Sequence, residues 1–391
     1  MNKTIGCVIA YNDNHNNYGT SLQGYAMLKK IQDLGYSCEV IRYIKKLSYK
    51  QKIQYIINAI RAGETKNIIA RITKKNNLRK HPQYAEGIKQ RTKVVNQYKE
   101  IKIIPYFHKF IGFQALQEGT KIYDAIVVGS DQVWSPLSLP NKFFNLLFVD
   151  ENIPKIAYAS SFGVSEIPTF QKKATGKYLD RFQVIGVREQ RGKEIVESLS
   201  HKKAQVVADP TLLLDRKEWE KEIRESKKRE SQPFIFCYFL GNNPNARKAA
   251  NELKEKTGYK IITIRHMDEY VPEDEFFGDE APYDIDPNDF IALISQAAYV
   301  CTDSFHCTVF SIIFEKQFMT FYRFAIGSKT ARNSRIDSLF AVLGINRERI
   351  YSNEICETIN HPIDYISVNQ RLSQLREESI KFLTNALKYK S

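Results

Sequence analysis

Short apolar runs alternate along the chain with longer segments in which apolar residues recur every three or four positions. The run IGCVIAY at residues 5–11 predicts a buried strand, and residues 22–36 carry a broad apolar side that predicts a helix. Gly35 is typical of a helix end, and the alternating residues 37–44 after it predict a second strand. The chain therefore begins with a strand-helix-strand unit.

The same alternation returns after residue 122, and here each predicted strand ends in a polar turn. The strands lie within residues 123–134, 155–163 and 182–199, the last of which continues into a helix. Neighbouring parallel strands end at one edge of a sheet, where ligands gather in open α/β folds. We therefore expect one cleft to be lined by Ser130, Asp131, Ser160, Ser161 and Arg188.

An Asp-Pro pair and a highly charged tract predict a domain boundary near residue 208, where a second α/β series begins. Apolar runs predict strands at 233–241, 259–266 and 297–302, with helices between them and a final helix from about residue 368. A chain of 391 residues favours two domains over one core. The predicted fold class is α/β, with Rossmann-like domains at 1–207 and 208–391 facing across a cleft.

The stretch DSFHCTVFSIIF places one histidine where a buried strand gives way to a helix. Asp303 and Ser304 are candidate caps, and His306 falls in the first turn of the helix. The free N–H groups and positive dipole of a helix N-terminus suit anions. A histidine there also fits a plain hydrogen-bonded or solvent-facing role.

A basic segment at residues 44–105 interrupts the first domain. It has 16 Lys and Arg against three Glu and no Asp, so it carries 13 of the chain's 14 net positive charges. Ile53, Ile56, Ile57 and Ile60 share one helical face. The segment is predicted to be a helical insertion, which either docks through its isoleucines or adheres to an anionic membrane surface.

Composition narrows the classes of protein and site further. The chain has no apolar run of the roughly 20 residues that span a bilayer, and residues 5–11 are too short for a signal peptide, so we expect a cytoplasmic protein. Six cysteines without a CxxC pair, and no histidine pair at ligand spacing, give no indication of disulfides or a metal. The signatures of nucleic-acid binding are likewise not evident.

Several motifs in this order resemble the polysaccharide pyruvyl transferase family. The resemblance spans most of residues 5–345 and rests on NYGTSLQGYAMLKKIQDLGYSCEVIRY, DAIVVGSDQVW, YASSFG, VREQRG, VADPTLLL and TDSFHCTVFSIIF. It implies a two-domain fold like that of GT-B glycosyltransferases. It also implies transfer of pyruvate from phosphoenolpyruvate to two hydroxyls of a sugar, giving a ketal and phosphate, with phosphoenolpyruvate as co-substrate and no cofactor. The products of such enzymes are surface polysaccharides such as capsule and exopolysaccharide, or their precursors.

The resemblance also assigns candidate residues. His306 matches the family's motif histidine and would shuttle a proton, while Arg188 of the VRE turn would grip a phosphate or carboxylate; we count Asp131 with them as catalytic. Arg335 looks like the family's later cationic position. The amide-rich loop after the first strand suits sugar hydroxyls, although Asn and Gly also simply make turns. We place on the acceptor side Asn17, Tyr18, Ser130, Asp131, Gln132 and Ser160.

The chain departs from the family at one position. Many members have Arg-Leu-His where this chain has Ser304-Phe305-His306, so an arginine that would hold the donor's anions is replaced by Ser304. Lys329, Arg332 or Arg323 is expected to compensate.

Two other functions fit the same patterns. A GT-B glycosyltransferase that uses a nucleotide sugar would show the same periodicity, and release of nucleotide instead of phosphate would identify it. A non-catalytic protein that binds carbohydrate or an anionic surface would explain the basic segment. The identity of the sugar, and whether the acceptor is free, polymeric or lipid-linked at the inner membrane face, stay open.

Overall fold

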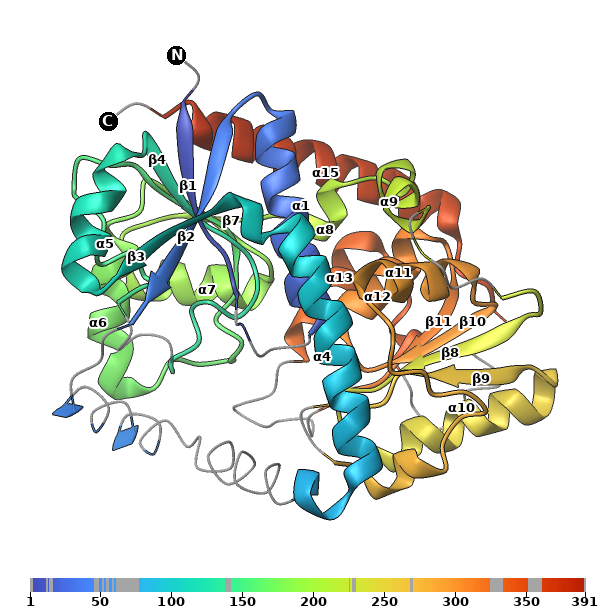
Figure 1. The fold of residues 1–391 in the computed structure, drawn as a ribbon. Helices are drawn as coiled ribbons and strands as arrows, with labels where there is room; N and C mark the ends of the chain where they lie inside the picture. The colour runs from blue at the N-terminus through green and yellow to red at the C-terminus, as the bar shows by residue number, and fades with distance from the viewer. Residues whose placement is uncertain are drawn as a thin grey trace.

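The computed structural model contains two parallel sheets, each packed against helices, and the chain passes from the first to the second near residue 208 (Figure 1). The structure describes residues 3–11, 13, 17–45, 49–50, 53, 56–57, 60, 77–137, 142–224, 226, 230–267, 270–323, 333–350 and 361–389. The predicted α/β class with two Rossmann-like halves is confirmed.

The first half is built on a seven-stranded sheet in the order β3-β2-β1-β4-β5-β6-β7, and all its neighbouring strands run parallel. The strands are β1 (Thr4–Val8), β2 (Ser37–Ile44), β3 (Phe107–Ile111), β4 (Ala125–Val128), β5 (Lys155–Ser160), β6 (Val184–Val187) and β7 (Ala204–Val206). Because parallel strands end at one edge, the turns that follow them meet there.

The second half has a smaller parallel sheet in the order β11-β10-β8-β9. Its strands are β8 (Phe234–Tyr238), β9 (Lys260–Thr263), β10 (Tyr299–Thr302) and β11 (Gln317–Thr320). Every residue of β8 is buried, which is why this strand reads as an unbroken apolar run rather than an alternating one.

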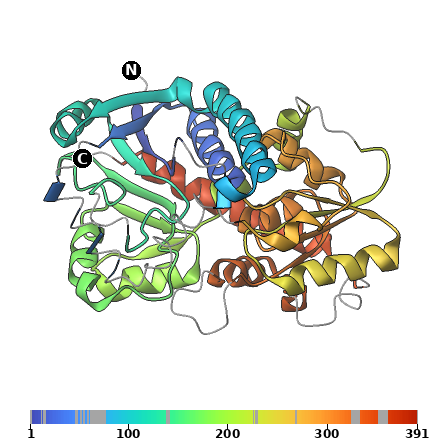
Figure 2. The ribbon, with the colours of Figure 1, turned by 60° about the horizontal axis from the view of Figure 1, so that its bottom comes forward.

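Helices cover both sheets and fill the space between them (Figures 1 and 2). In the first half they are α1 (Tyr18–Asp33), α4 (Pro82–Lys102), α5 (Phe113–Gly119), α6 (Thr169–Leu179) and α7 (Gln190–Leu199). After residue 208 come α8 (Pro210–Leu213), α9 (Arg216–Ile223), α10 (Pro244–Thr257), α11 (Pro287–Gln296), α12 (Phe305–Ile313), α13 (Ser334–Leu343) and α15 (Tyr365–Leu387). Short 3-10 turns lie at Ile104–Tyr106, Thr120–Ile122, Pro272–Glu275 and Arg347–Arg349.

The hydrophobic core continues from one half into the other through α1. Leu22 of α1 belongs to the same buried cluster as Phe236 of β8 and Phe310 of α12. The ring of Tyr18 stacks on that of Phe290, with centroids 4.6 Å apart. The two halves are therefore joined by shared apolar burial as well as by the chain itself.

Helix α4 starts from the first half and rests on the second. It runs beside α1 between the two sheets (Figure 2). The guanidinium of its buried Arg91 donates hydrogen bonds to the carbonyls of Arg265, Pro282 and Tyr283, at 3.0, 2.8 and 3.3 Å. Part of the predicted basic insertion is thus an interdomain helix.

Helix α15 returns the chain to the first half. It packs against β5 and α8, and the Ser379 hydroxyl accepts a hydrogen bond from the Ala208 amide at 2.9 Å. Near the helix end, the Lys3 ammonium donates to the carbonyl oxygen of Leu387 at 3.3 Å. Both ends of the described chain therefore lie beside the first sheet (Figure 1).

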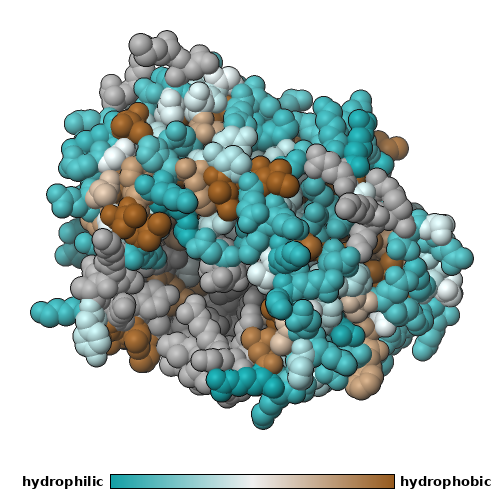
Figure 3. Space-filling model, viewed as in Figure 1, coloured by the Kyte–Doolittle hydropathy of each residue, from teal (hydrophilic) through white to brown (hydrophobic). Residues whose placement is uncertain are grey.

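The surface between the two halves is hollowed, and the face seen in Figure 3 is mostly hydrophilic. Ile53, Ile56, Ile57 and Ile60 are each exposed, by 41–53% of their surface, so the predicted docking through these isoleucines is not seen.

No helix in the described ranges is long and apolar enough to cross a membrane. The five described cysteines are buried and form no disulfide.

Candidate active site

A cavity of about 440 Å³ lies where the strand ends of the first sheet face the N-terminus of α12. Both halves contribute to its wall, so it is the interdomain cleft that the sequence predicts. Its polar lining consists of Asn17, Thr20, Asp131, Gln132, His266, Ser304, His306, Arg323 and Arg335.

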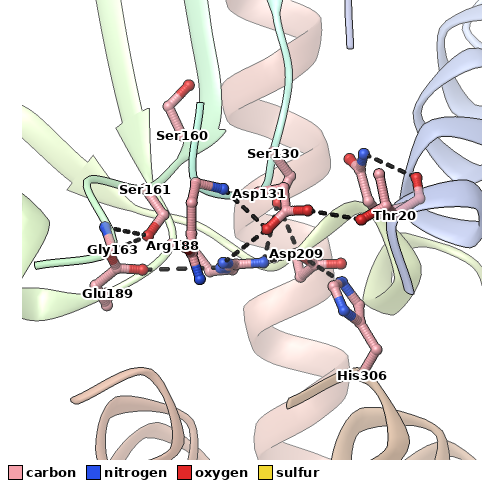
Figure 4. Close-up of polar contacts among 12 residues, drawn as sticks. Thr20, Ser130, Asp131, Ser160, Ser161, Gly163, Arg188, Glu189, Asp209 and His306 are labelled. Atoms are coloured by element: carbon pink, nitrogen blue, oxygen red, sulfur yellow. Dashed lines mark hydrogen bonds and ion pairs between the residues drawn. The ribbon is translucent and has the colours of Figure 1, made fainter. Parts of the chain in front are cut away.

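His306 is fixed by its helix and by the absence of a side chain at position 19. Ser304 caps α12, with its hydroxyl accepting a hydrogen bond from the Cys307 amide at 3.4 Å. The imidazole rests on Gly19 at the start of α1, where a Cβ atom would lie only 2.1 Å from Nδ1. Nε2 points toward Asp209 of the first half (Figure 4), 3.7 Å from its Oδ2.

Asp209 is a fully buried carboxylate that joins His306 to the strand ends (Figure 4). Its Oδ2 accepts hydrogen bonds from the Ser130 hydroxyl at 2.7 Å and from Arg188 Nη1 at 2.9 Å. Its Oδ1 accepts from the amide and hydroxyl of Thr211. Burial by itself would raise the pKa of the Asp209 carboxyl, but His306 and Arg188 lower it well below its usual range. Asp209 is therefore ionised at neutral pH.

Asp131 occupies a tight turn after β4. Its backbone has a φ of 74°, in the region that favours glycine, and its own carboxylate accepts a hydrogen bond from the Gln132 amide at 2.9 Å. The other carboxylate oxygen accepts from the Thr20 hydroxyl at 2.9 Å. Burial opposes its ionisation, yet Arg188 and His306 hold the pKa of the Asp131 carboxyl below its usual value. The strained turn thus presents a charged carboxylate to the cavity.

Arg188 lies behind the cavity wall and not in it. Its side chain is 2% exposed, and its guanidinium lies over the Phe305 ring, 4.6 Å from the centroid. Besides Asp209 it faces the carboxylates of Asp131 at 4.0 Å and Glu189 at 3.7 Å. Burial opposes its charge, but the three carboxylates raise the pKa of Arg188. Arg188 does not line this cavity, and its Nε and Nη2 make no hydrogen bond with the described residues, so its predicted grip on a donor stays a prediction.

Arg335 does line the cavity, on the other half of the molecule. It lies in the first turn of α13, and its guanidinium is 5.7 Å from the centroid of the Phe305 ring. Burial and then the neighbouring Arg188 lower the pKa of Arg335 to about 9. An anion in the cavity would stabilise its charged form.

The other predicted site residues either line the cavity, are buried outside it, or lie outside the described residues. Asn17, Gln132 and Ser304 line the cavity, and Asn17 also caps α1. Tyr18 lies in the core and donates its hydroxyl hydrogen to the Ile285 carbonyl, while the Ser160 hydroxyl donates to the Gly129 carbonyl, so neither side chain lines the cavity. Ser130 and Ser161 were also predicted to line the cleft, but both are buried and donate to Asp209 and Glu189 instead, so neither lines the cavity. Lys329 and Arg332 lie outside the described residues.

Sequence reasoning missed the partner of His306 and several residues of the cavity wall. Asp209 is not among the predicted site residues, although its position after a strand is the signal that it shares with Asp131 and Arg188. Thr20 and Gly19 follow Asn17 in the amide-rich loop without a chemical signal of their own. His266 was read only as the end of a strand.

Comparison with known families decides between the functions that this geometry allows. The family model for polysaccharide pyruvyl transferases matches residues 17–323. The chain belongs to the polysaccharide pyruvyl transferase family. The match runs from the cap of α1 to Arg323, so it includes His306 and the turns of the first sheet. Membership of this family makes the chain a transferase acting in polysaccharide biosynthesis.

Solved structures support the fold. The chain resembles a UDP-GlcNAc 2-epimerase from Neisseria meningitidis bound to UDP-GlcNAc, with a TM-score of 0.53 and 9% identity over 98% of this chain and 99% of that one. A UDP-N-acetylglucosamine 2-epimerase from Listeria monocytogenes gives a TM-score of 0.50 and 8% identity, over 99% and 96%. At such identities the likeness shows only the GT-B-type architecture. No curated protein matches the chain.

Metal ligands do not gather in the part of the chain that the structure describes. Within it, no three His, Cys, Asp or Glu side chains lie close enough to hold an ion. The carboxylates of Asp209 and Asp131 instead lie next to the guanidinium of Arg188, and that of Asp209 also lies next to the imidazole of His306.

Proposed function

We propose that the protein transfers pyruvate from phosphoenolpyruvate to two hydroxyls of one sugar, forming a cyclic ketal and releasing phosphate. The observation that carries the proposal is His306, held between Gly19 and the ionised Asp209 at a cavity that also contains Arg335 and Asp131. The family match supports the pyruvyl transfer, and the chemistry below assigns a part to each residue.

The reaction needs one proton delivered and two removed. A proton added to the methylene carbon of phosphoenolpyruvate places cationic character on its second carbon, which the first hydroxyl attacks with loss of its proton. The carbon–oxygen bond to phosphate then breaks, and the second hydroxyl closes the ketal with loss of another proton, so that of the two hydroxyl protons one balances the proton given to the methylene carbon and the other leaves on the phosphate. An imidazole both holds and releases protons near neutral pH, so His306 is suited to this exchange.

Asp209 supports His306 without itself exchanging protons. Its lowered pKa keeps it anionic, and its Oδ2 lies 3.7 Å from Nε2, so the carboxylate helps to fix the direction in which the imidazole points. Arg188 in turn fixes Asp209 through the 2.9 Å hydrogen bond. We infer that Arg188 is a positioning residue, whereas His306 reaches the substrate.

The donor's anionic groups are assigned to the arginines of the second half. Arg335 and Arg323 both line the cavity, and Arg323 is anchored by a hydrogen bond to the Asp303 carbonyl at 3.2 Å. Guanidinium groups bind phosphate and carboxylate through paired hydrogen bonds. Of the three cations predicted to compensate for the family arginine at Ser304, Arg323 lies among the described residues and lines the cavity. Lys329 and Arg332 stay predictions.

The acceptor is assigned to the opposite wall. Asp131, Asn17 and Gln132 come from the first half and line the cavity. The ionised carboxylate of Asp131 can accept hydrogen bonds from sugar hydroxyls, and the amide side chains can both donate to them and accept from them. In this assignment, the two hydroxyls of the sugar that receive pyruvate lie between Asp131 and His306, the proton shuttle.

The test is turnover with phosphoenolpyruvate and a panel of saccharides, measured by phosphate release and by the mass of the pyruvylated product. His306→Ala should lower turnover by about 10²–10⁴-fold. His201→Ala is the matched control, because His201 is exposed and does not line the cavity, and its backbone amide, which the change keeps, donates to Asp180 Oδ1 at 2.8 Å, so turnover should not change. Wild-type activity in His306→Ala would remove the histidine from the mechanism. Nucleotide release from nucleotide sugars, with no phosphate release from phosphoenolpyruvate, would favour glycosyl transfer instead.

A further inference from the structure

A second cavity of about 470 Å³ adjoins the first, on the outer strands of the first sheet. Tyr11, which follows β1, belongs to the walls of both cavities. The second cavity is otherwise lined by side chains of β2, β3 and the residues next to them, including Arg42, Lys45 and Lys109. The two cavities therefore share a wall at Tyr11.

The cations of this cavity are brought together by strand register. Arg42 of β2 and Lys109 of β3 are direct partners on adjacent strands, so their side chains leave the sheet on the same face. Like charges side by side destabilise a sheet. Lys45 adds a third positive charge one residue after β2.

Only one acid offsets these charges in the wall. The Asp13 carboxylate lies 2.5 Å from Arg42, but its side chain is 64% exposed, so solvent screens its attraction to the guanidinium. Lys45 and Lys109 form no ion pair with any acid in the described ranges. A stronger anion can therefore displace Asp13 from Arg42.

Two cationic side chains lie near the ring of Tyr11, with Asp13 and Glu100 as the neighbouring acids. The Arg42 guanidinium lies 5.0 Å from the centre of its ring, and the ammonium of the buried Lys99 lies 5.5 Å from it. Burial lowers the pKa of Lys99 to about 8, against the opposing effect of Asp13. A bound anion would stabilise the charged form of Lys99, so the surroundings of Tyr11 also favour a negative ligand.

We propose that this second cavity binds the phosphate or diphosphate group of the acceptor, whose sugar ring then reaches past Tyr11 to the first cavity. This proposal rests on the proposed function, because the protein has an acceptor sugar only if it transfers pyruvate. The chemistry recognised is a sugar diphosphate, which is found in nucleotide sugars and in polyprenyl-linked sugars alike.

The first test uses inorganic diphosphate as the probe and needs no turnover. The full chain is titrated calorimetrically with diphosphate in saturating phosphoenolpyruvate, so that the cations of the first cavity are occupied. Wild type should bind diphosphate, and the double variant Arg42→Gln, Lys109→Gln should bind at least about tenfold more weakly, since each charged hydrogen bond contributes about 1.5–3 kcal/mol. Lys248→Gln, an exposed change on α10, should bind as wild type does. No binding by wild type, or equal binding by the double variant, overturns the proposal.

The second test identifies the source of the diphosphate. The KM for a nucleotide sugar, a polyprenyl-diphosphate sugar and a neutral oligosaccharide is measured for wild type and the double variant. The variant should raise the KM of a diphosphate acceptor by about tenfold or more and leave that of the neutral saccharide unchanged. Equal changes for all acceptors contradict the subsite. Diphosphate binding at Arg42 and Lys109 without any pyruvyl transfer would instead reject the proposed function and leave the anion site standing.

Discussion

Gly19 leaves the space that the imidazole of His306 fills. An added Cβ would lie 2.1 Å from Nδ1 and 2.4 Å from Cγ, so Gly19→Ala must displace the ring from its present position beside Asp209. We expect turnover to fall by about 10²-fold or more, because a displacement of about 1 Å in a catalytic group has that effect. The fold should persist, since alanine favours the helix.

Gly24→Ala is the matched control on the same helix. Its Cβ would meet only the terminal methyl of Ile9, at 3.1 Å, and that methyl can move. Single-turnover rates with phosphoenolpyruvate, together with circular dichroism, compare the two variants. Equal rates for Gly19→Ala and wild type would show that the position of His306 is not critical.

Asp209 should couple stability to pH. Its pKa is lowered in the folded protein, so its contribution is present above the unfolded value of about 3.9 and is lost as pH falls toward the folded value. The stability gap between wild type and Asp209→Asn should therefore be about 1 kcal/mol smaller at pH 3 than at pH 5. Urea unfolding at the two pH values measures it. A gap that does not change would mean that Asp209 is not ionised in the folded state.

The residues of the site were predictable to different degrees. His306 and Asp131 could be found because a strand end gives each a position, and both line the cavity. The pairing of Asp209 with His306 could not be found, since it forms only when the two halves dock. The burial of Arg188 behind Phe305 has the same origin, because Phe305 belongs to the other half.

At the scale of elements, the apolar strands and the amphipathic helices followed the predicted alternation, whereas α4 and β3 did not. The buried side of α4 includes Tyr84, Arg91 and Tyr98, so its contact face is partly polar and lacks a clean apolar stripe. β3 is an edge strand of only five residues, FHKFI, with one buried position. Edge strands carry polar residues, and a pattern based on burial does not find them.

Helix α4 should contribute to stability through Arg91. Removing the guanidinium leaves the carbonyls of Arg265, Pro282 and Tyr283 without this donor, and an unsatisfied buried group costs about 1–3 kcal/mol. Arg91→Met should lower the free energy of unfolding by about 3 kcal/mol. Lys93→Met, at an exposed position of α4, should be nearly neutral. Denaturant unfolding distinguishes them, and similar values for both would mean that α4 is not held by Arg91.

At the scale of the whole molecule, the basic segment remains a candidate for membrane attachment. Its exposed isoleucines lie among lysines, and each basic residue near an anionic bilayer contributes about 1 kcal/mol. Wild type should co-sediment with anionic vesicles, less so as salt rises, and hardly with neutral ones. Changing Lys46, Lys50 and Lys52 to Gln should weaken the attachment, and so should Ile56→Asn with Ile60→Asn. Negligible sedimentation on both lipids would instead point to a soluble acceptor.

The path of α15 decides how the molecule can be divided. The chain leaves the first sheet near Ala208 and comes back along α15, where Ser379 contacts that same residue. In topological terms the second sheet is an insert within the first domain, tethered at two neighbouring points. A single cut near residue 208 would separate α15 from Tyr158, whose ring faces Phe382 of this helix. A cut before Tyr365 would instead take α15 away from α13 of the second half and break the hydrogen bond from the Tyr365 hydroxyl to the Ser311 carbonyl. Because α15 binds both halves, neither half keeps all its packing when the chain is divided.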